Sequence, residues 1–196
     1  MYKVLVVWFL FVLVSCDEAM LNEMVYGSDE TQTSNIYLIK AGNHDIDGHR
    51  SIARKRIDTL RFSFSFDSTA IYRTKSPQNQ GDINKLYGLS DCEDHHHTNS
   101  ARFGWRWTGE NLEVLAYCYL NGERKWALID VVELNDLNNA AIFFSDQQYI
   151  FKLNDTTLSM PRSCSARAIG YQLYPYFGGD ETAPQDIRIF IEDDTE

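Results

Sequence analysis

The chain of 196 residues carries 18 basic and 28 acidic side chains, which gives a net charge of −10 at neutral pH. Nucleic-acid binding depends on basic surface, and anionic lipid headgroups repel an acidic protein, so this balance argues against both as electrostatic partners. Aromatic residues make up 13% of the chain and supply large apolar side chains for one domain with a substantial core.

The first segment has the features of an export signal. Lys3 precedes an unbroken apolar run over residues 4–14, which has the length of a signal-peptide core and is too short to span a bilayer as a helix. The sequence Leu-Val-Ser-Cys that ends at Cys16 resembles the bacterial lipobox, in which the cysteine thiol receives a diacylglycerol. An ordinary secretory signal cut nearby is the alternative. We expect a lipoprotein signal peptide over residues 1–16 and lipidation of Cys16.

Residues 17–35 are acidic and polar, which predicts a tether between the lipid and a folded domain over residues 36–196. The expected location is a bacterial cell envelope, at the outer membrane, with membrane contact through the lipid on Cys16. Cys92, Cys118 and Cys164 remain after the signal, and their spacing matches no zinc motif. Export permits a disulfide, but an odd number leaves one thiol free, and unpaired or buried thiols are the favoured interpretation.

From Ile36 onward, short runs of alternating apolar and polar residues are separated by turn residues, a pattern typical of a β-sandwich or barrel. Asn121-Gly122 is a strong hairpin signal that joins the runs 112–120 and 124–133. Further runs lie at 36–39, 149–153, 170–176 and 186–191, whereas 135–144 weakly favours a helix. We predict an all-β fold, a two-sheet jelly-roll sandwich. Its expected core includes Phe62, Phe64, Leu112, Val114, Ala116, Ile187 and Ile189.

Two neighbouring runs have a polar and aromatic face opposite an apolar one. Arg102 and Arg106 alternate with Phe103 and Trp105, and the tyrosines of 112–120 alternate with core residues. Tyrosine rings stack on sugars, and guanidinium groups bind carboxylates or hydroxyls, so this face indicates a ligand surface. Packing beneath a loop is the alternative. The expected ligand-binding residues are Arg102, Arg106, Tyr117, Tyr119, Tyr174 and Tyr176.

The tract His95-His96-His97 is a weak candidate for a metal site. Adjacent residues of a strand point in opposite directions, so at most His95 and His97 would share a face. A third ligand would have to come from elsewhere, with His44, His49 or Asp91 as candidates. Solvated loop histidines are the favoured interpretation, and we expect no bound metal and no cofactor.

One class of hydrolase is disfavoured by Leu128. Laminarinase-like glycoside hydrolases on the jelly-roll fold use Glu-x-Asp-x-x-Glu, but the matching run here begins with Leu128 and keeps only Asp130 and Glu133. Retaining hydrolysis needs two carboxyl groups about 5 Å apart, and a leucine cannot replace one of them. A lyase needs a cation for a uronate carboxylate, and a base and an acid. Residues of these types are Arg102, Arg106, His95, His97, Tyr117 and Tyr119.

Residues 170–179, which end in Tyr-Pro-Tyr-Phe-Gly-Gly, and the run 183–189 resemble the C-terminal end of concanavalin A-like lectin and glucanase sandwiches. With Lys85-Leu86-Tyr87-Gly88 and residues 100–106, the chain is similar to uncharacterised lipoproteins of the Bacteroidota type. The resemblance implies the fold and an envelope location, and it transfers no catalytic residue. We expect a non-catalytic protein that binds a glycan or polysaccharide. A polysaccharide lyase-like enzyme and an adhesion protein that binds another protein are the alternatives.

Overall fold

The structure is a computed structural model that describes residues 36–48 and 52–195. The expected signal peptide, the tether, the lipidation site Cys16 and the metal candidate His49 therefore lie outside the described residues. Within the part that is described, no helix has both the length and the apolar character needed to cross a membrane.

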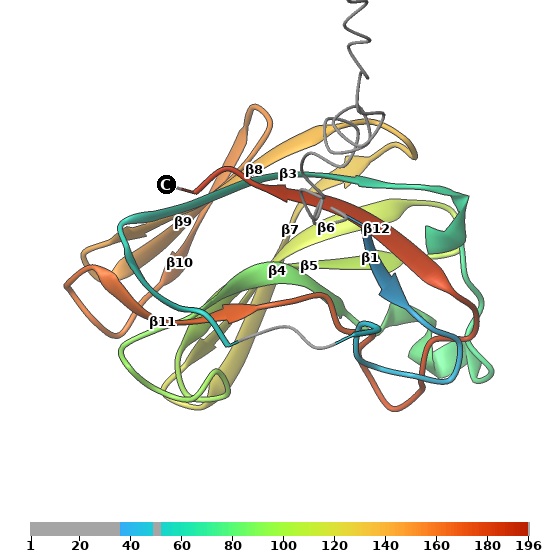
Figure 1. The fold of residues 1–196 in the computed structure, drawn as a ribbon, viewed down its shortest axis with the longest axis horizontal. Helices are drawn as coiled ribbons and strands as arrows, with labels where there is room; N and C mark the ends of the chain where they lie inside the picture. The colour runs from blue at the N-terminus through green and yellow to red at the C-terminus, as the bar shows by residue number, and fades with distance from the viewer. Residues whose placement is uncertain (1–35, 49–51, 196) are drawn as a thin grey trace, which may run out of the picture. The chain divides into compact units, whose positions relative to one another are not determined.

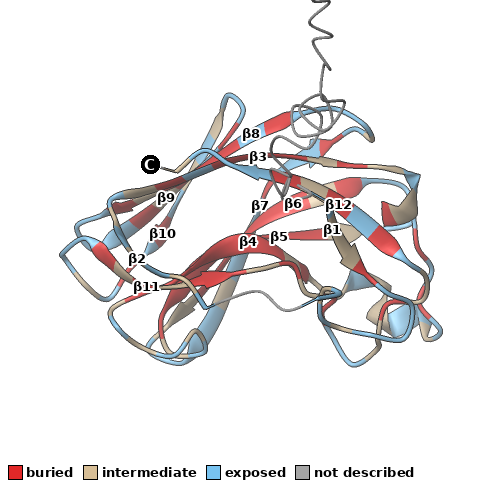
Figure 2. Cartoon of the chain, in the orientation of Figure 1, coloured by how far each residue is buried: buried red, intermediate tan, exposed pale blue. Residues whose placement is uncertain are grey.

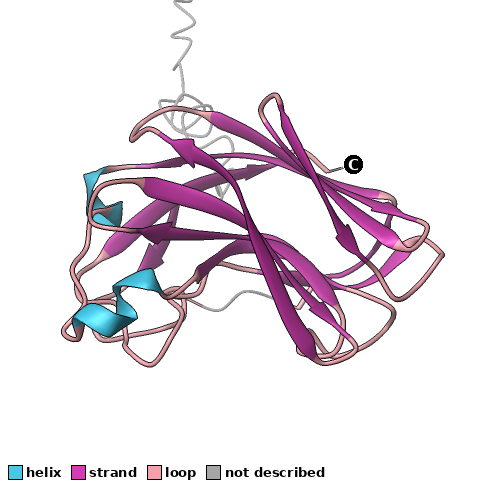
Figure 3. Cartoon of the chain, turned by 180° about the vertical axis from the view of Figure 1, so that it is seen from behind, coloured by secondary structure: helices cyan, strands magenta, loops and turns pink. Residues whose placement is uncertain are grey.

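Two antiparallel sheets of six strands stack face to face (Figure 1), and two short 3₁₀ helices, η1 (Ser68–Ala70) and η2 (Pro77–Gly81), lie in loops at one end (Figure 3). The first sheet has the order β1 (Ile36–Ile39), β12 (Ile187–Asp193), β3 (Thr59–Phe66), β8 (Asn138–Ser145), β9 (Gln148–Leu153), β10 (Thr156–Pro161). The second has the order β2 (Arg54–Ile57), β11 (Ala168–Leu173), β4 (Asn84–Ser90), β5 (Ser100–Trp107), β6 (Leu112–Leu120), β7 (Glu123–Val132).

The core lies between the sheets because each central strand turns one row of side chains inwards. Figure 2 shows that the buried residues lie mainly along the strands of the two layers. On β3 the alternating phenylalanines enter this core, and Phe62 packs edge-to-face on Phe103 of β5 with ring centres 5.5 Å apart. The predicted two-sheet all-β sandwich is confirmed. The expected core residues Phe62, Phe64, Leu112, Val114, Ala116, Ile187 and Ile189 are all buried.

The hairpin between β6 and β7 forms at Asn121 and Gly122, whose φ angles of 51° and 86° both lie in the left-handed region that a type I′ turn requires. The helix expected weakly over 135–144 is wrong, because this segment forms β8, paired with β3 and β9. Its residues Ala140, Ile142 and Phe144 are buried at alternate positions. Pairing on both sides therefore overrides a weak local preference for helix.

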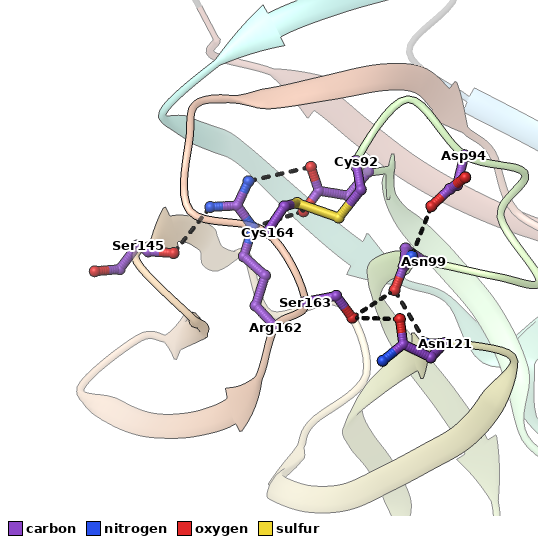
Figure 4. The surroundings of a disulfide bond; sticks show 9 residues. Cys92, Asp94, Asn99, Asn121, Ser145, Arg162, Ser163 and Cys164 are labelled. Atoms are coloured by element: carbon purple, nitrogen blue, oxygen red, sulfur yellow. Dashed lines mark hydrogen bonds and ion pairs between the residues drawn. A yellow bond between two sulfur atoms is a disulfide. The ribbon is translucent and has the colours of Figure 1, made fainter.

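A disulfide joins Cys92 to Cys164, which are 72 residues apart in sequence and 5.8 Å apart between Cα atoms. The interpretation as unpaired thiols is therefore wrong for these two cysteines, because folding brings together segments whose proximity the spacing does not reveal. Cys118 is free and buried on β6. Next to the disulfide lies Arg162 (Figure 4), which forms a fully buried ion pair with Asp91 at 2.6 Å. The disulfide and the ion pair thus connect the turn after β4 to the segment before β11.

Candidate functional site

A groove of about 620 Å³ lies on the face of the second sheet that points away from the core. Strands β4, β5, β6 and β11 form its floor. The turn between β4 and β5, the loop around Asp45 and residues 174–179 form its walls. Arg102, Tyr117 and Tyr119 lie together at the surface where strand alternation placed them, whereas the ring of Tyr174 packs against Tyr37 and Tyr87 beside the core. All the expected ligand residues except Arg106 line the groove: Arg102, Tyr117, Tyr119, Tyr174 and Tyr176.

Arg102 lies in the first half of β5, opposite Gly88 of β4 and Tyr117 of β6. A Cβ atom at position 88 would lie 2.2 Å from the Cβ atom of Arg102, so only glycine fits opposite this arginine. On the other side, the guanidinium carbon lies 5.6 Å from the centre of the Tyr117 ring, within the range of a cation–π interaction. Gly88 and Tyr117 together fix the position of the guanidinium.

The Arg102 side chain is buried without a negative partner. The residue is 6% exposed, and within residues 36–48 and 52–195 it forms no salt bridge. Its Nε atom has no hydrogen-bond partner. Burial lowers the pKa of Arg102, and the neighbouring groups that oppose this shift are tyrosines and a thiol, none of them a carboxylate. A buried cation of this kind is costly unless something neutralises it.

Gln172 of β11 also has an unpaired buried polar atom, on the other face of the sheet. Its Nε2 atom donates to the carbonyl oxygen of Gly88 at 2.6 Å, which holds the side chain against β4. Its Oε1 atom is buried and has no hydrogen-bond partner. Gln172 pairs with Leu89, which pairs with Ala101, so its side chain lies on the core face of the sheet and not on the face of Arg102. Buried polar groups in folded proteins are nearly always satisfied, so the unpaired donor of Arg102 is the one that points to a polar ligand in the groove.

Lys85 and Arg124 add positive charge to the same groove. Lys85 lies on β4, with its Nζ atom 2.7 Å from the carbonyl oxygen of Ile83 and 5.1 Å from the centre of the Tyr117 ring. Burial, together with the charges of Arg102 and Arg124, lowers the pKa of Lys85 to about 8. Asp45 is the acidic side chain that lines the groove. An acidic chain therefore carries a positively charged groove.

The structure separates Arg106 from Arg102, to which the sequence assigned the same role. Glu113 lies directly across from Arg106 on β6, and the Arg106 Nε atom donates to its carboxylate at 2.7 Å. Arg106 lines a smaller hollow of about 160 Å³, which shares Lys85 and Tyr117 with the groove. Its guanidinium lies 5.4 Å from the centre of the exposed Trp126 ring. Arg106 is thus a neutralised side chain beside the groove.

The histidine tract lies in the turn between β4 and β5, where residues do not alternate as on a strand. The expectation that only His95 and His97 can share a face is therefore wrong, and all three rings gather together. Two of the candidate third ligands lie elsewhere. Asp91 is paired with Arg162, and the Nδ1 atom of His44 lies 2.8 Å from the carbonyl oxygen of Phe177.

His96 and His97 also line the groove. The Nδ1 atom of His96 lies 2.7 Å from the hydroxyl of Tyr171 on β11. Burial, reinforced by the nearby charge of Arg102, lowers the pKa of His96 to about 4. Burial and the neighbouring His95 also lower the pKa of His97. Both groove histidines are therefore neutral at physiological pH.

Sequence reasoning missed Lys85 and Arg124. Alternation gave no usable signal for Lys85, because the pairing of β4 with β5 shifts between Lys85 and Gly88. A local irregularity of this kind cannot be read from period-two alternation.

No protein-family model and no curated protein matches this chain. Among solved structures, the alginate lyase AlyC3 superposes with a TM-score of 0.53 at 11% identity, over 80% of this chain and 72% of the lyase. The fold is a concanavalin A-like jelly roll. A toad ovary galectin in complex with thio-digalactose (TM-score 0.38, 12% identity, 80% of this chain and 98% of the galectin) also matches. So does the carbohydrate-binding module CBM66 from Bacillus subtilis (TM-score 0.39, 9% identity, 81% and 92%). The fold is thus shared with an alginate lyase.

Proposed function

We propose that the protein binds an acidic glycan in this groove, and that Arg102 receives a carboxylate of the sugar. The observation that carries the proposal is the buried guanidinium of Arg102, which has no ion-pair partner in the described chain and opens onto the groove. A ligand carboxylate would supply the missing negative charge through a charge-assisted hydrogen bond. The groove tyrosines offer rings for stacking on sugars.

The class of glycan follows from the charge of the groove. Three basic side chains, Lys85, Arg102 and Arg124, line it in a chain of net charge −10, which favours a polyanion over a neutral sugar. Alginate, a linear polyuronate, is a suitable first ligand, because the fold is shared with an alginate lyase.

Calorimetric titration with alginate oligosaccharides tests the proposal. A hydrogen bond to a charged group contributes about 1.5–3 kcal/mol, so Arg102→Met should weaken binding about tenfold or more. Arg106→Met on the same strand is the matched control and should weaken binding less, because Glu113 already neutralises that arginine. Equal affinity of wild type and a correctly folded Arg102→Met variant would contradict the proposal. Equal binding of a neutral oligosaccharide would contradict the acidic specificity.

A polysaccharide lyase is the second candidate function. It is favoured by one observation: Lys85, His97 and Tyr119, groups able to act as a base or an acid, line the same groove as Arg102. β-Elimination of a uronate requires neutralisation of the carboxylate and such a pair of proton-transfer groups. Incubation with alginate would produce an unsaturated sugar with strong ultraviolet absorbance. A binding protein gives no such increase in absorbance.

We further propose that the protein is attached to a bacterial envelope through a lipid on Cys16, with residues 17–35 as the tether. The support is the lipobox-like sequence that ends at Cys16. Mass spectrometry of the N-terminal peptide from detergent-extracted protein should show a lipid-sized increment. Cys16→Ser should abolish this increment and release the protein from the membrane fraction. An unmodified and soluble wild-type protein would contradict the proposal.

A further inference from the structure

His95, His96 and His97 form a compact cluster of imidazoles, of which His96 and His97 line the groove. The ring centres of His95 and His96 are 4.2 Å apart, as are those of His96 and His97, and the outer pair is 5.2 Å apart. One ring nitrogen from each histidine lies within 4.8 Å of the other two. Three potential metal ligands thus converge from one turn.

The turn that carries the cluster is held by hydrogen bonds within it. The backbone N–H groups of Thr98 and Asn99 both donate to the carbonyl oxygen of His95, at 2.7 and 3.1 Å. The hydroxyl of Ser100 donates to the carbonyl oxygen of His96 at 2.7 Å. The disulfide at Cys92 fastens the start of the turn to the segment before β11. The backbone that presents the three imidazoles is therefore already in place before any ligand binds.

Tyr171 orients the middle histidine. Its hydroxyl accepts from the backbone N–H of His96 at 3.0 Å and lies 2.7 Å from the Nδ1 atom of the same residue. This contact engages Nδ1 and leaves Nε2 of His96 as the coordinating atom. Metal-binding histidines in proteins are typically held in this way by a hydrogen bond to the second ring nitrogen.

We propose that His95, His96 and His97 bind a divalent transition-metal ion such as Zn²⁺. Zinc bonds to imidazole nitrogens at about 2.0–2.1 Å, which places tetrahedral ligands about 3.3 Å apart. The ring nitrogens must approach somewhat, and the exposed position of His95 and His97 leaves room for this. A zinc ion held by three histidines keeps one position for water or a ligand, and His96 and His97 line the groove.

The proposal does not depend on glycan binding. Lys85 and Arg102 lie in the same groove, and their positive charges oppose a bound cation, so the imidazoles must supply the affinity. Imidazole ligands select zinc, copper or nickel over calcium and magnesium, which prefer oxygen ligands. We therefore expect no competition from Ca²⁺ or Mg²⁺.

Zn²⁺ titration by calorimetry tests the site, with the full chain in detergent and without a polyhistidine tag. We expect one Zn²⁺ per chain, and a weakening of about tenfold or more in each of His95→Gln, His96→Gln and His97→Gln. His44→Gln is the matched control, because His44 lies in another loop and points to Phe177, and it should bind Zn²⁺ as the wild type does. Zinc binding that is absent, or equal in all four variants, would overturn the proposal.

The Tyr171→Phe variant tests whether the orientation of His96 by Tyr171 contributes to metal binding, or whether three neighbouring histidines suffice. The variant keeps all three imidazoles and removes the hydroxyl that orients His96, and loss of such an outer partner typically costs about 10–100-fold in metal affinity. Co²⁺ serves as the spectroscopic probe, because its visible absorption reports the coordination number. Wild-type affinity in Tyr171→Phe, with unchanged Co²⁺ absorption, would overturn the assigned role of Tyr171. Circular dichroism checks that every variant is folded.

Discussion

Arg102 and Arg162 are both buried, and they differ in what neutralises them. Arg162 donates to both carboxylate oxygens of Asp91, at 2.6 and 3.2 Å, and to the carbonyl oxygen of Ser145 at 2.8 Å. Arg102 has a tyrosine ring beside it and no carboxylate among the described residues. The positive charge of Arg162 is neutralised within the folded protein, next to the disulfide. The positive charge of Arg102 has no such partner among the described residues, and it lies at the groove.

The two buried arginines should therefore respond differently to mutation. Removing one partner of a buried ion pair destabilises a protein, because the other charge is left buried and unpaired. A buried charge that has no partner from the start already lowers the stability of the ligand-free protein. Mutations at the Cys92–Cys164 disulfide and the Asp91–Arg162 pair should therefore change the free energy of unfolding. Mutations in the groove should change the affinity for a ligand.

Replacing Arg162 should produce the largest effect. Arg162→Met leaves the Asp91 carboxylate buried and unpaired, so we expect the free energy of unfolding to fall by about 3–5 kcal/mol. Arg102→Met removes a desolvated charge and should leave the stability unchanged or raise it. Urea denaturation of both variants measures the contrast.

A double variant sharpens this test. Asp91→Leu combined with Arg162→Met removes both charges and should recover most of the stability lost in Arg162→Met alone. If Arg102→Met is as destabilised as Arg162→Met, the two arginines do not differ as the contacts suggest, and the interpretation of Arg102 as a ligand-binding group loses its basis.

The disulfide should contribute to stability by a similar amount. It closes a loop between residues 72 positions apart, and the entropy lost by an unfolded chain with such a cross-link corresponds to about 4 kcal/mol. We expect the Cys92→Ala, Cys164→Ala double variant to lose this stability in urea denaturation. A reducing agent should destabilise the wild type and leave the double variant unchanged. If the reducing agent has no effect on the wild type, the two cysteines are not cross-linked in the purified protein.

The fold was readable from the sequence because strand alternation and turn chemistry are local. Phe62 and Phe64 had to share a face once one side was buried, and Asn121-Gly122 specified its own turn. The same alternation placed Arg102 and Tyr117 on one surface. The pairing of Arg106 with Glu113 depends on the register of β5 and β6, and the disulfide depends on the approach of distant loops. Those relations are set by tertiary structure, so the sequence alone did not reveal them.

Lys85 provides the last and smallest test, because its charge changes near physiological pH. Burial and the neighbouring charges of Arg102 and Arg124 lower its pKa to about 8. Below that pH the ammonium group attracts an anionic ligand, and above it the neutral amine does not. A hydrogen bond to a charged group contributes about 1.5–3 kcal/mol, so affinity for alginate oligosaccharides should fall roughly tenfold as the pH rises from below to above 8.

The stability of the free protein should change in the opposite direction. Between pH 8 and the ordinary lysine pKa of 10.5, the unfolded chain holds a proton at Lys85 that the folded chain has released. The free energy of unfolding therefore rises with pH in this window, because the unfolded state binds more protons. Lys85→Met should remove both dependences, and Lys85→Arg should keep the affinity and abolish its loss above pH 8. Affinity that falls equally in wild type and Lys85→Arg would show that another group titrates, and would remove Lys85 from the binding surface.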